Sequence, residues 1–133
     1  MSVTGIEQAA RLRAAFDTIE EAYEFMLAYA AQGRKTEAGA GGGESQIRNF
    51  LQRFAAACDD VLDATSEGLG GTAGAAFAER FRTDTAVARS VLALLLERPN
   101  VTSAMVDNSN GLIAMRGFLT DIFFTDQVVL PPR

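Results

Sequence analysis

The sequence contains no histidine and only one cysteine, Cys58. Histidine is the commonest transition-metal ligand and the commonest general base, so its absence excludes ordinary zinc sites, His-carboxylate di-iron sites, His-ligated haem and His-dependent catalytic triads. A single cysteine cannot form an internal disulfide, and Cys58 falls within a predicted apolar stripe, where it is expected to be a small core side chain. No cofactor is therefore expected.

Positive charge and long apolar runs are also scarce. The net charge is -5 and the pI is about 4.7, so the chain lacks the basic surface that phosphate binding requires, and nucleic acid is not an expected partner. Wholly apolar runs, such as residues 91–96, are far shorter than the roughly 20 residues of a membrane span. No secretory signal is recognisable at the N-terminus. We expect an acidic, soluble, cytoplasmic protein without a membrane span.

What the sequence does contain is a strong helical pattern. Its 133 residues fit one domain, predicted to extend over 1–133. Apolar residues recur every three or four positions in about 4–33, 44–67, 72–98 and 101–124, and no strand pattern competes. The prediction is an all-α, antiparallel four-helix bundle.

Glycine and proline mark the predicted connections. A glycine-rich stretch at about 34–43 predicts a flexible linker after the first helix. Gly68, Gly70 and Gly71 are expected to end the second helix, and Thr72 to cap the third. The tail at about 128–133, with two consecutive prolines, is predicted to be extended.

One polar residue interrupts the apolar face of the last predicted helix. This face steps through Val101, Met105, Leu112 and Met115, and Asn108 occupies the position where another apolar side chain is expected. Two interpretations remain open. Either the chain turns within residues 107–111, which are rich in turn formers, or the helix is continuous and Asn108 faces the core.

If the helix is continuous, a small-molecule pocket in the bundle core is one prediction. Counting residues from the shared end of the bundle places Asn108 level with Tyr23 and Phe54, and Asp84 level with Arg116. A mostly apolar pocket with a few orienting polar groups is the usual design of a small-molecule site. The alternative is that these polar groups fix helix register. The candidate ligand-binding residues are Tyr23, Phe54, Asp84, Asn108 and Arg116.

Acidic residues on the first two helices allow an enzymatic alternative. The segments Glu20-Glu21-x-x-Glu24 and Asp60-x-x-Asp63 resemble the acidic pattern of the all-α nucleoside triphosphate pyrophosphohydrolases, although that family has glutamate where Asp60 stands. The resemblance implies Mg²⁺ bound by Glu20, Glu21, Glu24, Asp60 and Asp63. Carboxylates can bind Mg²⁺ without histidine. However, helical spacing turns Asp60 and Asp63 outward from the second helix, away from the three glutamates.

Together these patterns favour a non-catalytic binding, accessory or regulatory protein over the Mg²⁺-dependent enzyme. A long first helix followed by a flexible linker, together with apolar residues off the main seam, favours a homodimer. These extra apolar residues are Phe25, Tyr29, Phe118 and Phe124. The expected ligand is a protein partner or a small apolar molecule.

Overall fold

The computed structural model describes residues 3–37 and 45–133, and all regular secondary structure in these ranges is helical. Its elements are α1 (Val3–Ala30), α2 (Gln46–Ala64), α3 (Ala75–Leu96), α4 (Ser103–Gly111), α5 (Ile113–Phe124) and a π-helical segment η1 (Thr125–Val129). The predicted all-α class is confirmed. None of the described helices is sufficiently long and apolar to cross a membrane.

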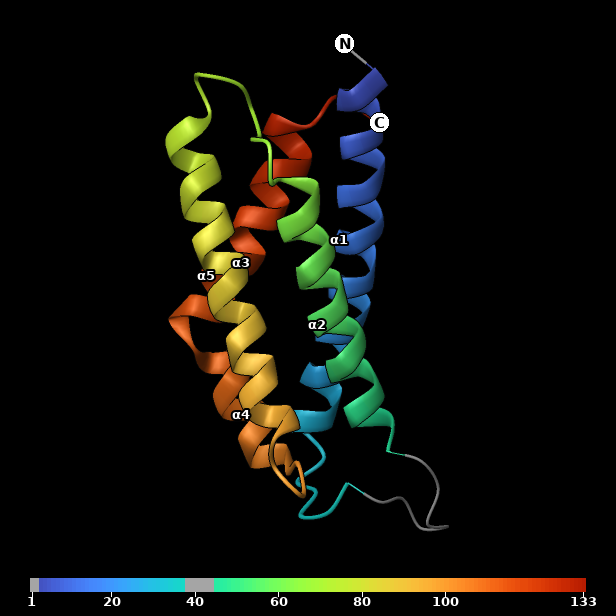
Figure 1. The fold of residues 1–133 in the computed structure, drawn as a ribbon. Coiled ribbons are helices and arrows are strands. Elements are labelled where there is room, and N and C mark those ends of the chain that lie inside the picture. Colours follow the sequence, from blue (N-terminus) through green and yellow to red (C-terminus); the bar gives the residue numbers. More distant parts are fainter. Residues whose placement is uncertain (1–2, 38–44) are drawn as a thin grey trace.

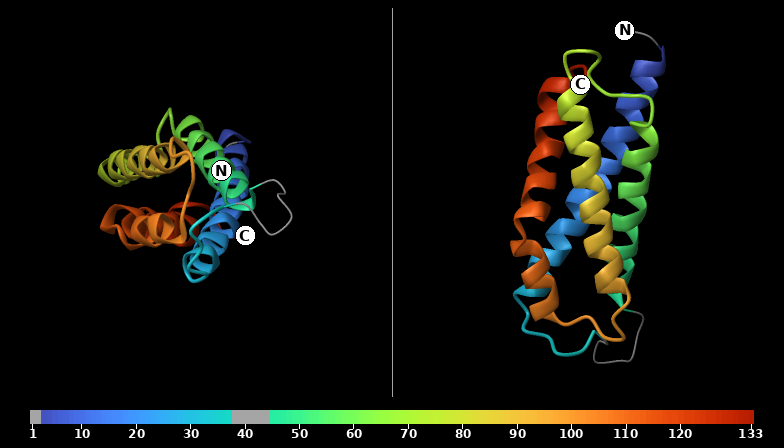
Figure 2. Two further views of the ribbon diagram at one scale, coloured as in Figure 1. Left: turned by 90° about the horizontal axis from the view of Figure 1, so that it is seen from below. Right: turned by 60° about the vertical axis from the view of Figure 1, so that its left-hand side comes forward.

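The helices form an elongated bundle (Figure 1). α1, α2 and α3 run along the length of the molecule, and α4 and α5 follow one another along its remaining side (Figure 2). α1 packs on α2 and α2 on α3, whereas α4 packs mainly on α1 and α5 mainly on α3. The chain ends near the start of α1, at the same end of the bundle.

The segment predicted as a fourth helix is broken at Leu112. This residue is extended, with φ -63° and ψ 134°, so it ends α4 and precedes α5. The turn-forming residues 107–111 are themselves helical, and the break follows Gly111, a residue type that weakens helices. The break changes which side chains face inward, because the helical phase of α5 no longer continues that of α4.

The third helix also differs from its predicted boundaries. It begins at Ala75, with Gly74 rather than Thr72 at the N-cap, and it continues without interruption past Asp84. Gly70 has φ +76°, a conformation that glycine adopts easily. A Cβ atom on Gly74 would lie 2.9 Å from the Gly70 Cα and carbonyl oxygen. The close turn between α2 and α3 therefore depends on glycine at both positions.

Phenylalanine side chains form the centre of the core. Phe54 and Phe81 each stack on Phe118, with ring centroids 6.3 and 6.2 Å apart, and Phe16 meets Phe81 edge to face at 6.2 Å. Burying each such side chain stabilises the fold by about 1.5–3 kcal/mol. Cys58 is fully buried nearby, and burial raises the pKa of its thiol to about 12. The thiol is therefore protonated and unreactive at neutral pH.

Residues 34–37, at the start of the predicted linker, are bound to the α3–α4 connection. The Ser103 amide donates to the Arg34 carbonyl oxygen at 2.9 Å, and the Val101 amide donates to Glu37 Oε2 at 2.6 Å. Arg48 on α2 forms an ion pair with Glu37 at 3.0 Å and lowers the pKa of that carboxyl. Residues 38–43 of the predicted linker lie outside the described residues.

The C-terminal segment is not fully extended, since Val128 and Val129 belong to η1 and only residues 130–133 follow it. Arg13 on α1 holds this segment against the bundle. Its Nε lies 2.8 Å from Asp126 Oδ1, and its Nη2 donates to the Pro131 carbonyl oxygen at 2.5 Å.

Candidate functional site: a groove between α3 and α4

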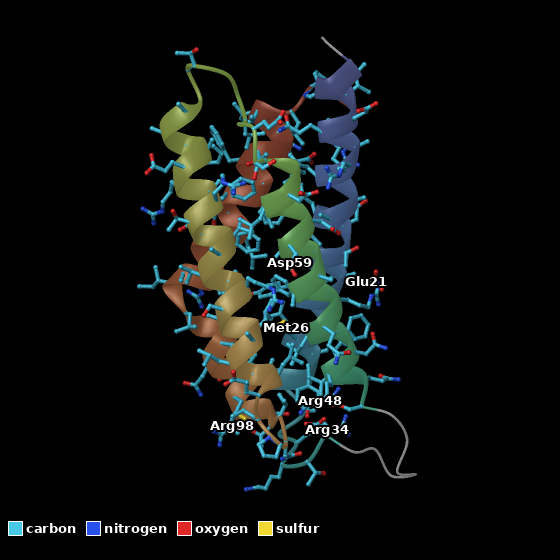
Figure 3. All side chains as sticks on the ribbon, in the orientation of Figure 1. Glu21, Met26, Arg34, Arg48, Asp59 and Arg98 are labelled. Atoms are coloured by element: carbon cyan, nitrogen blue, oxygen red, sulfur yellow. The ribbon has the colours of Figure 1, made fainter. Side chains whose placement is uncertain are left out.

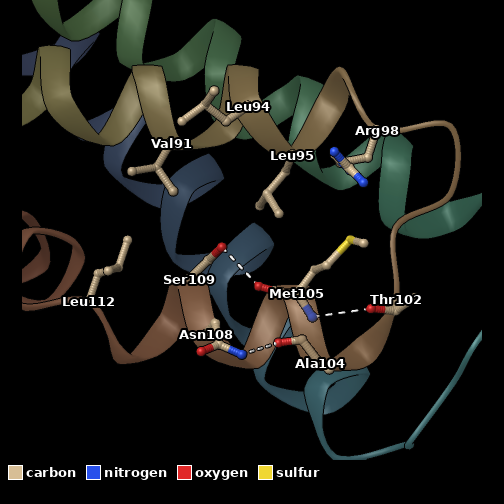
Figure 4. A pocket seen from close by; sticks show the side chains of 10 residues that line it. All are labelled: Val91, Leu94, Leu95, Arg98, Thr102, Ala104, Met105, Asn108, Ser109 and Leu112. Carbon is tan, nitrogen blue, oxygen red and sulfur yellow. Dashed lines mark hydrogen bonds between the residues drawn. The ribbon is translucent and has the colours of Figure 1, made fainter.

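A mainly apolar groove of about 650 Å³ lies between the C-terminal half of α3 and α4 (Figure 4). Its lining residues are Val91, Leu94, Leu95, Arg98, Thr102, Ala104, Met105, Asn108, Ser109 and Leu112. A volume of this size lies within the range of small-molecule sites. Among its lining residues, Arg98 is the one with a charged side chain.

The groove exists because of the way the chain passes from α4 to α5. α4 packs on α1 and touches α3 only slightly, while α5 returns to α3 after the break at Leu112. The facing surfaces of α3 and α4 consequently remain uncovered. Leu94 is 62% exposed and Leu112 is 43% exposed, and the neighbouring Ile113 is 87% exposed. Contiguous exposed apolar side chains of this kind commonly mark a binding surface.

The small polar side chains of the groove are bonded to their own helix. Thr102 Oγ1 accepts from the Met105 amide at 3.2 Å as the N-cap of α4, and Ser109 Oγ donates to the Met105 carbonyl oxygen at 3.0 Å. Asn108 Nδ2 donates to the Ala104 carbonyl oxygen at 2.8 Å. These groups shape the wall of the groove and retain further acceptor capacity.

Arg98 lies at the end of the groove nearest the α3–α4 connection. Figure 4 shows its guanidinium directed towards α4, and Figure 3 places it at the same end of the bundle as Arg34 and Arg48. Arg34 stacks over the Tyr29 ring and Arg48 pairs with Glu37. Within residues 3–37 and 45–133, the Arg98 guanidinium has no hydrogen bond, ion pair or ring contact, although its main-chain oxygen accepts from Arg48 at 2.8 Å.

Asn108 is exposed on the groove wall and does not face the core, so the predicted contact with Tyr23 is not formed. The polar amide that does enter the core belongs to Asn110. Its Nδ2 donates to the Met26 carbonyl oxygen at 3.3 Å, and its buried Oδ1 has no partner among the described residues. Within α4 the counted face is therefore out of phase with the packed face, in which Val106 and Asn110 are buried.

The other predicted pocket residues lie in separate places. Tyr23 borders a shallow depression of about 260 Å³ with Leu119 and Phe123. Phe54 is fully buried in the core, and Arg116 is exposed on α5. The fold therefore brings one of the predicted ligand-binding residues, Asn108, into the groove and leaves the others elsewhere.

Asp84 pairs with Arg80 on its own helix rather than with Arg116. Arg80 Nε lies 3.0 and 3.1 Å from the two Asp84 carboxylate oxygens. Across the α3–α5 interface, Asp121 faces Asp84, and no hydrogen-bond donor within residues 3–37 and 45–133 reaches its buried Oδ2. Burial, followed by the hydrogen bond and charge of Asp84, raises the pKa of Asp121 to about 7. A proton on Asp121 supplies the donor that two ionised carboxylates lack.

The acidic residues of the pyrophosphohydrolase-like pattern are not gathered into one site. Glu21 pairs with Arg53 at 3.4 Å, and Asp63 pairs with Arg11 at 2.6 Å. Asp60 is exposed on α2, while Glu20 and Glu24 border the depression beside Tyr23. Burial and the neighbouring Asp17 raise the pKa of Glu20. Across the described ranges, no three carboxylate or cysteine side chains are grouped to hold a metal ion.

Sequence reasoning missed Leu94 and Arg98 as site residues. The predicted apolar face of the third helix contained Leu92 and Leu95, and Leu94 lies about 100° or more away from both by helical spacing. A leucine outside the buried face was the available signal for a second apolar surface. Arg98 carried no comparable signal, because its lack of a partner is visible only in three dimensions.

Comparison of the chain with protein-family models, curated proteins and solved structures finds no match. The functional argument consequently rests on the groove itself.

Proposed function

We propose that this protein is a non-catalytic binding protein that holds a small apolar ligand in the α3/α4 groove. The observation that carries the proposal is the apolar lining of the groove, in which the side chains of Leu94 and Leu112 are exposed. Transfer of an apolar ligand from water into this groove buries apolar surface of both the ligand and the protein, which favours binding by about 25 cal/mol per Å² of buried apolar area. The ligand site is on the surface of the bundle rather than in its core.

We also infer that the architecture is an antiparallel four-helix bundle in which α4 and α5 together occupy the fourth position. The packing of α4 on α1 and of α5 on α3 supports this assignment. In this architecture α3 and α4 form the two walls of the groove, and the wall contributed by α4 ends at the break at Leu112.

Binding of an apolar probe tests the proposal. Decanol should perturb the NMR amide signals of α3 and α4 residues that line the groove, and Leu94→Gln should weaken its binding because a polar amide replaces the apolar wall. Leu27→Gln is the matched control, since Leu27 is 48% exposed on α1 and does not line the groove. Equal binding by both variants, or no perturbation of groove residues, contradicts the proposal.

We further propose that the protein forms a homodimer through the end of α5 and η1. Phe123, Phe124 and Val128 are 56%, 45% and 64% exposed there, and apolar side chains exposed close together in the sequence can form part of a contact between two copies of the chain. Light scattering over a range of protein concentrations should give a dimer mass, and Phe123→Gln together with Val128→Gln should shift it towards the monomer. A monomer mass at every concentration refutes the dimer.

A further inference from the structure

We infer that the ligand of the α3/α4 groove is an amphiphilic carboxylate, with its apolar chain along the groove and its carboxylate on Arg98. This inference rests on the proposed function, because it specifies the class of ligand for the same site. It adds a requirement for negative charge at one end, which a purely apolar ligand does not have.

The first argument is the state of Arg98 compared with the other arginines. Most arginine side chains in the described ranges are bonded to carboxylates, carbonyl oxygens or rings: Arg11, Arg13, Arg34, Arg48, Arg53, Arg80, Arg82, Arg89 and Arg133. Among the described residues, the guanidinium groups of Arg98 and Arg116 have no such partner, and Arg98 is the one of the two that borders the apolar groove. A guanidinium presents a planar set of donors that matches a carboxylate in bidentate geometry.

The second argument is that the polarity of the groove is concentrated at one end. Figure 4 shows Arg98 and Thr102 at the end next to the α3–α4 connection, and Val91 and Leu112 at the opposite end. Leu95 and Met105 lie between them. From Val91 to Arg98 the wall rises by roughly 10 Å at 1.5 Å per residue. A molecule with a charged head and an apolar tail matches this one-ended arrangement.

A helical peptide is the less favoured occupant. An amphipathic helix in a groove is recognised by apolar anchors repeated along its length, and it does not require a single cation at one end. The methionine of the groove suits an alkyl chain equally well, because its flexible thioether side chain adapts to irregular apolar shapes.

Probes with the same alkyl chain and different heads test the inference. Decanoate, decanol and decyltrimethylammonium should be titrated into the protein below the concentrations at which they form micelles, with binding followed by calorimetry and by NMR of groove residues. A charge-assisted hydrogen bond should make decanoate bind about tenfold or more tightly than decanol. The cationic probe should bind more weakly than decanol, because it meets the Arg98 charge.

Variants of Arg98 test whether the preference for decanoate over decanol depends on the Arg98 guanidinium. Arg98→Gln should abolish the advantage of decanoate over decanol when both probes are measured on the same variant, and Arg98→Lys should retain part of it, since a lysine keeps the charge but not the bidentate geometry. Arg53→Gln is the matched control, because Arg53 is exposed and lies outside the groove. It should leave the preference for decanoate intact.

The possible results separate the inference from the proposed function. Equal binding of decanoate and decanol in the groove, or a preference that survives in Arg98→Gln, overturns the carboxylate inference and leaves the apolar site standing. Failure of all three probes to perturb groove residues overturns both. Binding of an acidic amphipathic peptide in the groove without binding of decanoate also overturns the inference, because it replaces the small amphiphile by a protein partner.

Discussion

Asp121 should make the protein less stable as the pH rises from about 4 to about 8. Its carboxyl has a pKa of about 7 in the folded protein against an ordinary value of 3.8, chiefly because it is buried and then because Asp84 lies beside it. When folding raises the pKa of a carboxyl, the folded state is favoured at a pH low enough for the carboxyl to be protonated in both the folded and the unfolded protein. That contribution is complete below about 4 and is lost as the pH rises through 7.

The size of the effect follows from the shift in pKa. At about 1.4 kcal/mol per pKa unit, an elevation of about three units corresponds to roughly 4 kcal/mol. Asp121 is only partly buried, and solvent screening reduces the interaction, so we expect about 1–2 kcal/mol. For a domain of this size the corresponding change in Tm is about 3–10 °C.

Asp121→Asn isolates this contribution. The amide is uncharged at every pH and can donate a hydrogen bond to the Asp84 carboxylate, as the protonated carboxyl does. About two of the three pH units over which the contribution is lost lie above pH 5, so urea unfolding should show that the stability of the variant relative to the unmodified protein rises by about 1 kcal/mol between pH 5 and pH 8. Asp63→Asn is the control, since Asp63 forms an exposed pair with Arg11.

The prediction is refuted if Asp121→Asn and the unmodified protein differ in free energy of unfolding by the same amount at pH 5 and at pH 8. It is also refuted by a carbon-13 NMR titration in which the Asp121 carboxyl ionises at its ordinary pKa. Glu37 has a lowered pKa and destabilises the protein only under more acidic conditions, whereas the raised pKa of Glu20 acts in the same direction as that of Asp121. Because Glu20 is present in both proteins, its contribution cancels in the difference between Asp121→Asn and the unmodified protein.

The remaining predictions concern stability at defined contacts. Gly74→Ala should destabilise the fold by about 1–3 kcal/mol, because the new Cβ meets the Gly70 backbone at 2.9 Å. Gly117→Ala, whose new Cβ meets nothing within 4 Å, should be neutral or stabilise α5. Urea unfolding measures both, and an equal loss of stability in the two variants would contradict the role of the close turn. Glu37→Gln should lower the free energy of unfolding by about 1–3 kcal/mol, because it removes the charge paired with Arg48. Glu21→Gln should lower it by less than about 1 kcal/mol, because the pair of Glu21 with Arg53 is exposed. Similar losses in both variants would show that Glu37 does not fix the α3–α4 connection.

The class of fold could be predicted from the sequence because helical periodicity is a local property. The steps through Leu12, Phe16 and Ile19 on α1, and through Leu51, Phe54 and Cys58 on α2, identify faces that are indeed buried. The same reasoning gave the approximate ends of both helices. Boundaries at Gly74 and Thr102 were less accurate, since they depend on which of several turn-forming residues the packing uses.

The candidate site could not be predicted in the same way. Periodicity counted across residues 101–124 assumes one uninterrupted helix, whereas Leu112 is extended and separates two helices with different buried faces. The counted face is buried on α5, at Met115 and Ile122, but on α4 it is not, since Asn108 is exposed and Asn110 is buried. The Asp84–Asp121 neighbourhood is equally hidden from the sequence, because it joins side chains on α3 and α5 whose relative height depends on the break.

The break at Leu112 links the fold to the proposed site. If residues 103–124 formed one straight helix, one continuous stripe would pack against the bundle, and α4 would be held close to α3 just as α5 is. Because Leu112 is extended, α4 can pack on α1, where Asn110 bonds the Met26 carbonyl oxygen, while α5 packs on α3. Leu94 is left exposed in the groove, and Arg98 stands at the end of the groove with no side-chain partner in the described part of the chain. A polar amide placed in the core thus anchors the wall of an apolar groove on the surface, so the residues that determine the site include one that does not line it.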